Sequence, residues 1–164
     1  MTNKNRRKTV SLQMLGFEFR KTIGNPYVHI FGVGMPVLMM IIVTRAVTGE
    51  MPDAAMRASV CTSVFLRIGT LIPMATIFMC YRVSNAQEIE KGIPQRMELF
   101  GINARVSICN RILSEAMFIL LAFLIYFTVG YAVVDIKAPK LSGAMLYVLC
   151  ILGLSVILFC LAHG

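Results

Sequence analysis

The residues that most metal sites and nucleophilic active sites require are scarce in this sequence. It has two histidines, His29 and His163, which lie far apart along the chain. None of its five cysteines forms a Cys-x-x-Cys pair, and most lie in apolar runs, where cysteine behaves as a small hydrophobic residue. These absences argue against a metal site and against an intramembrane enzyme with a nucleophile and a neighbouring base. We therefore expect no catalytic residue, no metal and no cofactor.

The sequence also lacks a phosphate-binding loop of the form Gly-x-x-x-x-Gly-Lys-Ser/Thr, so we expect no ATP hydrolysis by this chain itself. No cleavable signal peptide is visible, because the apolar run that follows the basic start begins only at about Tyr27. The net charge of +8 comes from basic residues that lie between apolar runs. Membrane topology explains this placement better than nucleic-acid binding does, and we expect no nucleic-acid partner.

Apolar sequence is abundant: 57% of the 164 residues are hydrophobic, and the mean hydropathy is +0.75. An average soluble domain is about 45–50% apolar. Here the excess lies in long runs with almost no charge, and helices of about 20 such residues can cross about 30 Å of hydrocarbon. We predict an all-α transmembrane helical bundle with four spans, at about residues 27–44, 59–81, 111–134 and 141–162.

The distribution of Lys and Arg predicts the orientation of these spans. Six basic residues precede the first span, two follow it, five separate the second from the third, and two follow the third. By the positive-inside rule the N-terminus and residues 82–110 are cytoplasmic, and the two short connections face outward. We predict a multi-pass protein of the cell membrane, with cytoplasmic residues 1–26 followed by a transmembrane domain over 27–164.

Residues 9–24 have the pattern of an amphipathic interfacial helix rather than of a span. Its apolar residues recur at helical spacing: Leu12, Leu15, Phe19 and Ile23. Such a helix lies at the membrane surface, and the turn 24–26 (Gly-Asn-Pro) would end it and direct the chain into the membrane. A basic tail that anchors to anionic lipid and a structural elbow are both compatible with this pattern.

Residues 82–110 form a long connection, so we expect structure within it. Three apolar residues repeat there every four positions: Ile89, Ile93 and Met97. Pro94 suits a first helical position and Gly101 suits a helix stop. We predict a short helix from about Pro94 to Phe100.

A bend at Gly92 is expected to precede this helix. Glu88 and Glu90 would then lie near its N-terminal end, where negative charge is favourable. The alternative is that both carboxylates are solvated and pair with Lys91 or Arg96. Surface pairs of that kind contribute about 0–1 kcal/mol.

Taken in order, these features resemble the type-2 ATP-binding-cassette (ABC) export permeases. Those proteins begin with an amphipathic connecting helix and a basic turn, which residues 18–21 and 24–26 match, and their first span carries a proline like Pro36. A cytoplasmic Glu-x-Glu-x-Gly element follows their second span, and residues 88–92 (Glu-Ile-Glu-Lys-Gly) match it. The chain departs from the family at residues 93–94, where Ile-Pro replaces the Thr and the Leu-rich segment that often follow the glycine.

The resemblance implies a permease subunit of an ABC exporter, which moves substrate by using ATP hydrolysed on a separate cytoplasmic ATPase subunit. A second permease subunit, identical or related, would complete the substrate path. The ATPase-coupling residues that it implies are Glu88, Glu90, Gly92, Pro94 and Met97. The family has six spans, so four predict a partial subunit. The alternative is a self-contained four-span membrane binding or immunity protein with no ATPase partner.

Some polar residues and prolines within the predicted spans allow more than one interpretation. Arg67 lies about 12 Å from the outer end of the second span, close enough to snorkel or to join an interhelical ion pair. A substrate-facing position for Arg67 is the alternative. Glu115 lies one turn after Arg111, which predicts an ion pair within one helix. Pro36 and Pro73 are expected to kink their spans.

Overall fold

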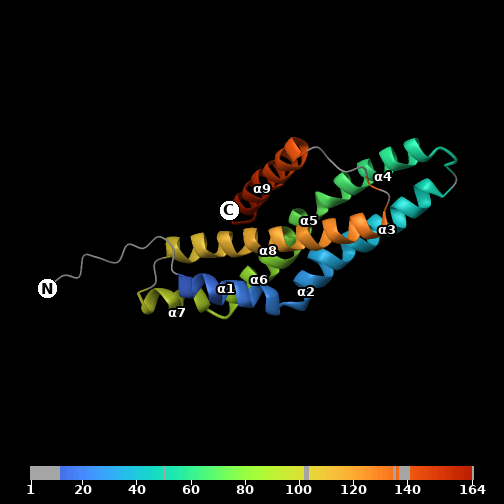
Figure 1. The fold of residues 1–164 in the computed structure, drawn as a ribbon. Helices are drawn as coiled ribbons and strands as arrows, with labels where there is room; N and C mark the ends of the chain where they lie inside the picture. Colours follow the sequence, from blue (N-terminus) through green and yellow to red (C-terminus); the bar gives the residue numbers. More distant parts are fainter. Residues whose placement is uncertain (1–11, 50, 102–103, 135, 137–140, 164) are drawn as a thin grey trace.

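The described part of the chain consists of α-helical and π-helical segments joined by short turns, with no strand, in a computed structural model that covers residues 12–49, 51–101, 104–134, 136 and 141–163 (Figure 1). It contains four helical rods that are long and apolar enough to cross a membrane: Pro26–Thr48, Ala54–Glu90, Arg105–Val133 and Ser142–Ala162. The predicted all-α bundle with four spans is therefore confirmed, and the four rods indicate a multi-pass membrane protein.

Two of the rods are assembled from several helical segments. The first rod consists of α2 (Pro26–His29), η1 (Ile30–Gly34) and α3 (Met35–Thr48). The second rod consists of α4 (Ala54–Gly69), α5 (Leu71–Met74), η2 (Ala75–Tyr81) and α6 (Arg82–Glu90). The third and fourth rods are the single helices α8 (Ala104–Val133) and α9 (Leu141–His163). Two short helices complete the fold, α1 (Leu12–Gly24) and α7 (Ile93–Leu99).

The second rod is much longer than predicted. It has 37 residues, or about 55 Å at 1.5 Å per residue, whereas about 30 Å suffices to cross the hydrocarbon. Residues 82–90, expected within the connection, continue the helix as α6. This stretch is polar, but it contains no glycine or proline that would end a helix. α8 also begins seven residues before the predicted start at Arg111, so the connection consists only of α7 and its flanks.

Each buried proline coincides with an interruption of regular α-helix. Before Pro36 the helix widens into the π-helical segment η1, where the Met35 N–H donates to the Ile30 carbonyl. Proline lacks an N–H, and its ring crowds the preceding turn, so a wider turn relieves the clash. Before Pro73, α4 ends at Gly69, and η2 follows the proline. Regular α-helix is therefore interrupted near both prolines for which kinks are predicted. The interruptions are π-helical segments and the end of α4.

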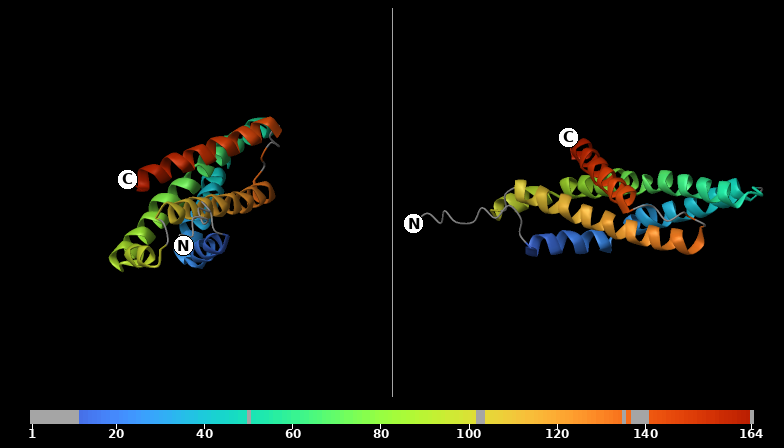
Figure 2. Two further views of the ribbon diagram at one scale, coloured as in Figure 1. Left: turned by 90° about the vertical axis from the view of Figure 1, so that its left-hand side faces the viewer. Right: turned by 45° about the horizontal axis from the view of Figure 1, so that its top comes forward.

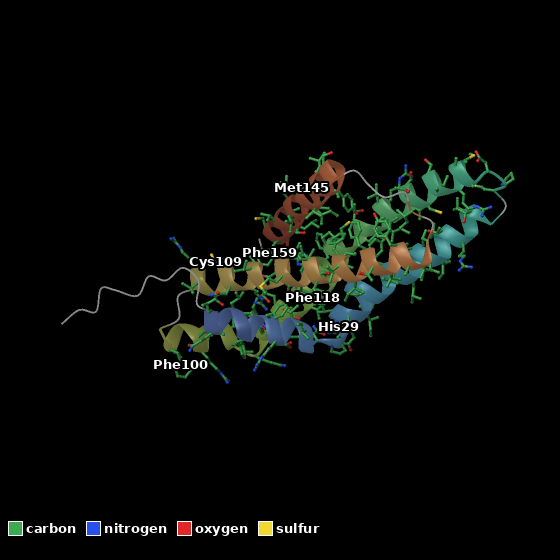
Figure 3. All side chains as sticks on the ribbon, in the orientation of Figure 1. His29, Phe100, Cys109, Phe118, Met145 and Phe159 are labelled. Carbon is green, nitrogen blue, oxygen red and sulfur yellow. The ribbon has the colours of Figure 1, made fainter. Side chains whose placement is uncertain are left out.

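Three rods approach one another closely at Gly32. A Cβ placed on Gly32 would lie 2.9 Å from Thr76 Oγ1 in η2 and 3.3 Å from Phe118 Cε1 in α8. Thr76 and Phe118 are both fully buried, and His29, one turn earlier, packs edge-on against the Phe118 ring with centroids 5.9 Å apart (Figure 3). Small residues allow membrane helices to pack at such short range. Gly32 therefore positions η1, η2 and α8.

An aromatic cluster joins the second, third and fourth rods. Phe65 stacks on Tyr126 with ring centroids 4.7 Å apart, and the Tyr126 hydroxyl donates to the Phe65 carbonyl at 2.8 Å. α9 packs against α5, η2 and α8, on the side of the bundle away from α1 (Figure 2). Its Tyr147 hydroxyl donates to the Leu66 carbonyl at 2.9 Å. That carbonyl lacks its usual helical partner, because the Thr70 N–H bonds to the Arg67 carbonyl.

Replacing Tyr147 by phenylalanine is expected to lower the free energy of unfolding by about 1 kcal/mol, because the Leu66 carbonyl then has no donor. The apparent melting temperature of the purified protein in detergent would report the loss. Tyr27→Phe is the matched control, because it also removes only a hydroxyl group, and Tyr27 is exposed. An equal shift in both variants would contradict this account of the α9 attachment.

Candidate functional site

A charged pocket of about 350 Å³ lies at the end of the bundle that carries α7. Side chains from α1, α6 and α8 line it, and α1 runs alongside the first turns of α8 (Figures 1 and 2). Its five charged residues in these three helices are Glu18, Lys21, Glu88, Arg111 and Glu115. Charged groups in membrane helices are rare unless they pair with one another, so this junction is the first place to look for function.

Glu88 connects the three helices. One carboxylate oxygen pairs with Lys21 Nζ of α1, and the other pairs with Arg111 Nη2 of α8 at 2.9 Å. Arg111 Nη1 also donates to Asn85 Oδ1 at 3.1 Å, and its guanidinium lies over the Tyr81 ring, 4.9 Å from the centroid. The Glu88 and Arg111 side chains are only 15% and 13% exposed. We call Lys21, Glu88 and Arg111 the Glu88 latch.

The polar side of α1 faces this junction. Glu18 and Thr22 are its buried residues; Lys21 Nζ lies 3.3 Å from a Glu18 oxygen, and the Thr22 hydroxyl donates to Glu115 Oε1 at 3.4 Å. By contrast, Leu12 is exposed. The predicted amphipathic helix is present over Leu12–Gly24, while residues 9–11 lie outside the described part of the chain. Glu18 and Lys21 therefore line the junction, whereas Arg20 of the same helix is exposed.

The turn after α1 is held from both sides. Asn25 Oδ1 accepts from the Tyr27 N–H at 3.1 Å and so caps α2, and Asn25 Nδ2 donates to Ser84 Oγ of α6 at 3.4 Å. His29 Nε2 also lies 2.6 Å from the Ile23 carbonyl oxygen. These contacts fix the direction in which the first rod leaves α1, as the structural-elbow interpretation requires.

The predicted ion pair between Arg111 and Glu115 is wrong for the described side chains. Arg111 instead pairs with Glu88, because α6 presents both Glu88 and Asn85 to the guanidinium. Glu115 accepts one hydrogen bond from Thr22, and its Oε2 atom is buried without a partner among the described residues. The junction thus contains one carboxylate oxygen with unused hydrogen-bonding capacity.

The alternative that Glu88 is solvated and pairs with Lys91 or Arg96 is likewise wrong among the described ion pairs, which join Glu88 to α1 and α8. Glu88 is largely buried, not solvated. Glu90 is exposed, and no ion pair between described residues includes it. The two carboxylates of the Glu-x-Glu-x-Gly element therefore differ: one binds neighbouring helices, and the other faces outward.

The short helix α7 matches the prediction to within one residue at each end. It is bounded by Gly92 and Gly101, whose φ angles are +65° and +77°, a left-handed conformation that favours glycine. Pro94 is exposed in the first turn, and Met97 is half-buried. The predicted bend at Gly92 and stop near Gly101 are confirmed.

Two large apolar residues project from the end of α7. Leu99 is 86% exposed and Phe100 is 84% exposed, and Phe100 lies at the outer edge of the molecule (Figure 3). Adjacent exposed Leu and Phe side chains of this kind are typical of sites that bind another protein, where aromatic anchors supply much of the energy. We call Leu99 and Phe100 the α7 tip.

Arg67 lies on an exposed face of α4, outside both the charged junction and the aromatic cluster. Its backbone carbonyl accepts from the Thr70 hydroxyl at 2.6 Å, and among the described residues its side chain joins no ion pair. The interhelical ion pair suggested for it is therefore absent from the described contacts. The snorkelling and substrate-facing interpretations of Arg67 both stay predictions.

The sequence-based site omitted the partners of Glu88. The sequence places Lys21 in a basic turn and predicts that Arg111 pairs with Glu115 at the start of a span. A signal was present: both residues belong to segments that the charge distribution places at the same end of the bundle as Glu88. Which cation meets which carboxylate depends on helix rotation, and no short motif encodes that.

Comparison with known proteins adds no assignment. The chain matches no protein-family model, no curated protein and no solved structure. A functional conclusion therefore depends on the geometry of the charged junction and of α7.

Proposed function

We propose that the chain is a permease subunit, or part of one, of an ABC exporter in the cell membrane, with its N-terminus and α7 in the cytoplasm. A cytoplasmic ATPase subunit binds α7 and moves it during ATP hydrolysis. The observation that supports this most is the Glu88 latch. It connects the helix that leads into α7 with α1, which precedes the first rod, and with α8, the third rod.

Force applied to α7 has a short path into the bundle. α7 follows α6 across a single bend at Gly92, and α6 is continuous with the second rod. Glu88, four residues before the bend, transmits a displacement of α6 to Lys21 and Arg111 through charge-assisted contacts, which are stronger than neutral hydrogen bonds. In this proposal three of the four rods therefore respond together.

The proposal gives the two carboxylates of the Glu-x-Glu-x-Gly element different roles. Glu90 and the α7 tip are exposed and form the surface that the ATPase binds. Glu88 is enclosed and passes the motion on. A second permease subunit, identical or related, completes the substrate path, and the ATP is bound by the partner ATPase.

Replacing both residues of the α7 tip, Leu99→Ser with Phe100→Ser, is expected to weaken ATPase binding at least tenfold, because two exposed apolar anchors are lost. The measurement is co-purification with the affinity-tagged chain. The captured protein must contain the phosphate-binding loop and hydrolyse ATP. Leu12→Ser is the matched control, since Leu12 is 83% exposed at the same end of the bundle.

Two results would contradict the proposal. One is a wild-type chain that captures no ATPase from its native membrane. The other is an ATPase that stays bound equally to the α7-tip variant and to the Leu12→Ser control. The first result would leave the four-span protein without an ATPase partner as the better assignment. The second would show that the ATPase does not bind through the α7 tip.

A further inference from the structure

A second pocket, of about 310 Å³, lies at the opposite end of the bundle from α7. It is formed by the last turn of α3, the first turn of α4 and the end of α8. The polar side chains that line it are Thr44, Arg45, Thr48 and Arg57. The remaining lining is glycine and apolar residues, so these four side chains determine what the pocket can bind.

The described residues that line this pocket carry positive charge. Two guanidinium groups line it, from Arg45 and Arg57, and no acidic residue is among the described residues of its lining. The acidic residue that directly precedes α4, Asp53, is occupied elsewhere: its side chain accepts from the Ala55 N–H at 3.0 Å and caps the helix. A ligand with negative charge is therefore favoured over a neutral or cationic one.

Two buried polar atoms at the pocket lack a partner. Thr44 is only 5% exposed, yet among the described residues its hydroxyl makes no hydrogen bond, and Arg57 Nε is likewise buried and has no described partner. Neighbouring groups are satisfied, since the Thr48 hydroxyl donates to the Thr44 carbonyl at 2.7 Å and Arg57 Nη2 donates to the Met51 carbonyl. Buried polar groups in proteins are nearly always hydrogen-bonded, so the two orphaned atoms indicate a missing acceptor.

We propose that this pocket binds a phosphate group, either free or esterified. Arginine forks match phosphate oxygens in geometry and charge, and a threonine hydroxyl donates to the same oxygens. The pocket volume lies at the lower end of the range of small-molecule sites, which accommodates a phosphate together with a short ester substituent. Inorganic phosphate and a phospholipid headgroup share this chemistry. The site goes beyond the proposed transport function and does not depend on it.

The position of the pocket makes both sources accessible. Thr44 and Arg45 lie at the end of an apolar rod, and α8 also ends beside the pocket, at Val133. Lipid phosphates lie just outside the hydrocarbon, where such rods end, and dissolved anions reach the same depth from the water. Separate probes are therefore needed to distinguish the two.

The test uses the full chain, purified in a detergent that contains no phosphate. Isothermal titration calorimetry is run with inorganic phosphate, with short-chain phosphatidylglycerol, and with short-chain diacylglycerol, which lacks the phosphate. Thr44→Val and Arg57→Gln are each expected to weaken binding at least tenfold. Arg82→Gln is the control for Arg57→Gln, because it removes the same charge. Arg82 is exposed at the other end of the second rod, away from the pocket.

Saturable binding of inorganic phosphate would identify the ligand as a free anion. Binding of phosphatidylglycerol, but not of inorganic phosphate or diacylglycerol, would identify it as a phospholipid headgroup. The proposal is overturned if neither phosphate probe binds, or if diacylglycerol binds as well as phosphatidylglycerol. Unchanged affinity in Thr44→Val also overturns it. Arg57 additionally holds the Met51 carbonyl, so if Arg57→Gln fails to fold, the nearly isosteric Thr44→Val variant decides alone.

Discussion

Replacement of Glu88 by alanine is expected to lower the free energy of unfolding by about 2–4 kcal/mol, the largest effect of any single charge removal described here. The change leaves Lys21 and Arg111 at one junction without the carboxylate that both contact. Partial exposure of Lys21 moderates the cost of the unpaired cations. The apparent melting temperature in detergent, followed with a thiol-reactive dye that labels cysteines exposed on unfolding, would report the loss.

Glu90→Ala is the matched control for this variant. Glu90 has the same side chain two positions away but is exposed, so a change within about 0.5 kcal/mol is expected. A double-mutant cycle with Lys21→Met and Glu88→Met should give a coupling energy of about 1–3 kcal/mol. Equal melting temperatures for Glu88→Ala and Glu90→Ala would show that the latch does not hold the helices together.

The same variants separate binding from transmission in the proposed transporter. If the ATPase binds the α7 tip, the Glu88→Ala variant still binds the ATPase. ATP hydrolysis by that ATPase is no longer stimulated by the permease, because a displacement of α6 is no longer transmitted to α1 and α8. The α7-tip variant, by contrast, loses the ATPase itself. Loss of both properties in both variants would place Glu88 on the binding surface and contradict its enclosed position.

Replacement of Gly32 by leucine is the second change with a large expected effect, about 3 kcal/mol of destabilisation. Even the first carbon of the new side chain would meet Thr76 Oγ1 at 2.9 Å and the Phe118 ring at 3.3 Å, so η1, η2 and α8 would have to separate. Gly153→Leu is the matched control in α9, because a Cβ there meets nothing within 4 Å. Both variants replace a helical glycine by leucine, and the packing cost at Gly32 should make the Gly32→Leu variant melt at a clearly lower temperature than the Gly153→Leu variant. Similar values would contradict the close crossing at Gly32.

Features that depend on local sequence could be predicted. Apolar runs of sufficient length located the four rods, since the need to pair backbone groups in lipid leaves little choice of structure. Gly92 and Gly101 located the ends of α7 because their backbone conformations are costly for other residues. The predicted end of the second rod is wrong: apolar sequence ends at the polar residues 82–90, but these contain no glycine or proline and the helix continues through them.

Features that depend on helix rotation could not be predicted. Arg111 could face Glu115 on its own helix or Glu88 on another, and only the packing of α6 against α8 decides between them. Arg45 and Arg57 were counted as two basic residues of an outer connection, which served only to orient the spans. Their convergence on one pocket requires α3 and α4 to pack as a hairpin with the end of α8 beside them.

The Glu88 latch draws its three charges from parts of the chain that leave the ribosome at different times. Lys21 emerges first, Glu88 follows at the end of the second rod, and Arg111 comes last. Before Arg111 is synthesised, Lys21 is the only cation of the latch, and it contacts two carboxylates, Glu18 and Glu88. Insertion of the third rod therefore brings Arg111, the second cation, together with a third carboxylate, Glu115, and the Glu88 latch is complete only once α8 is in place.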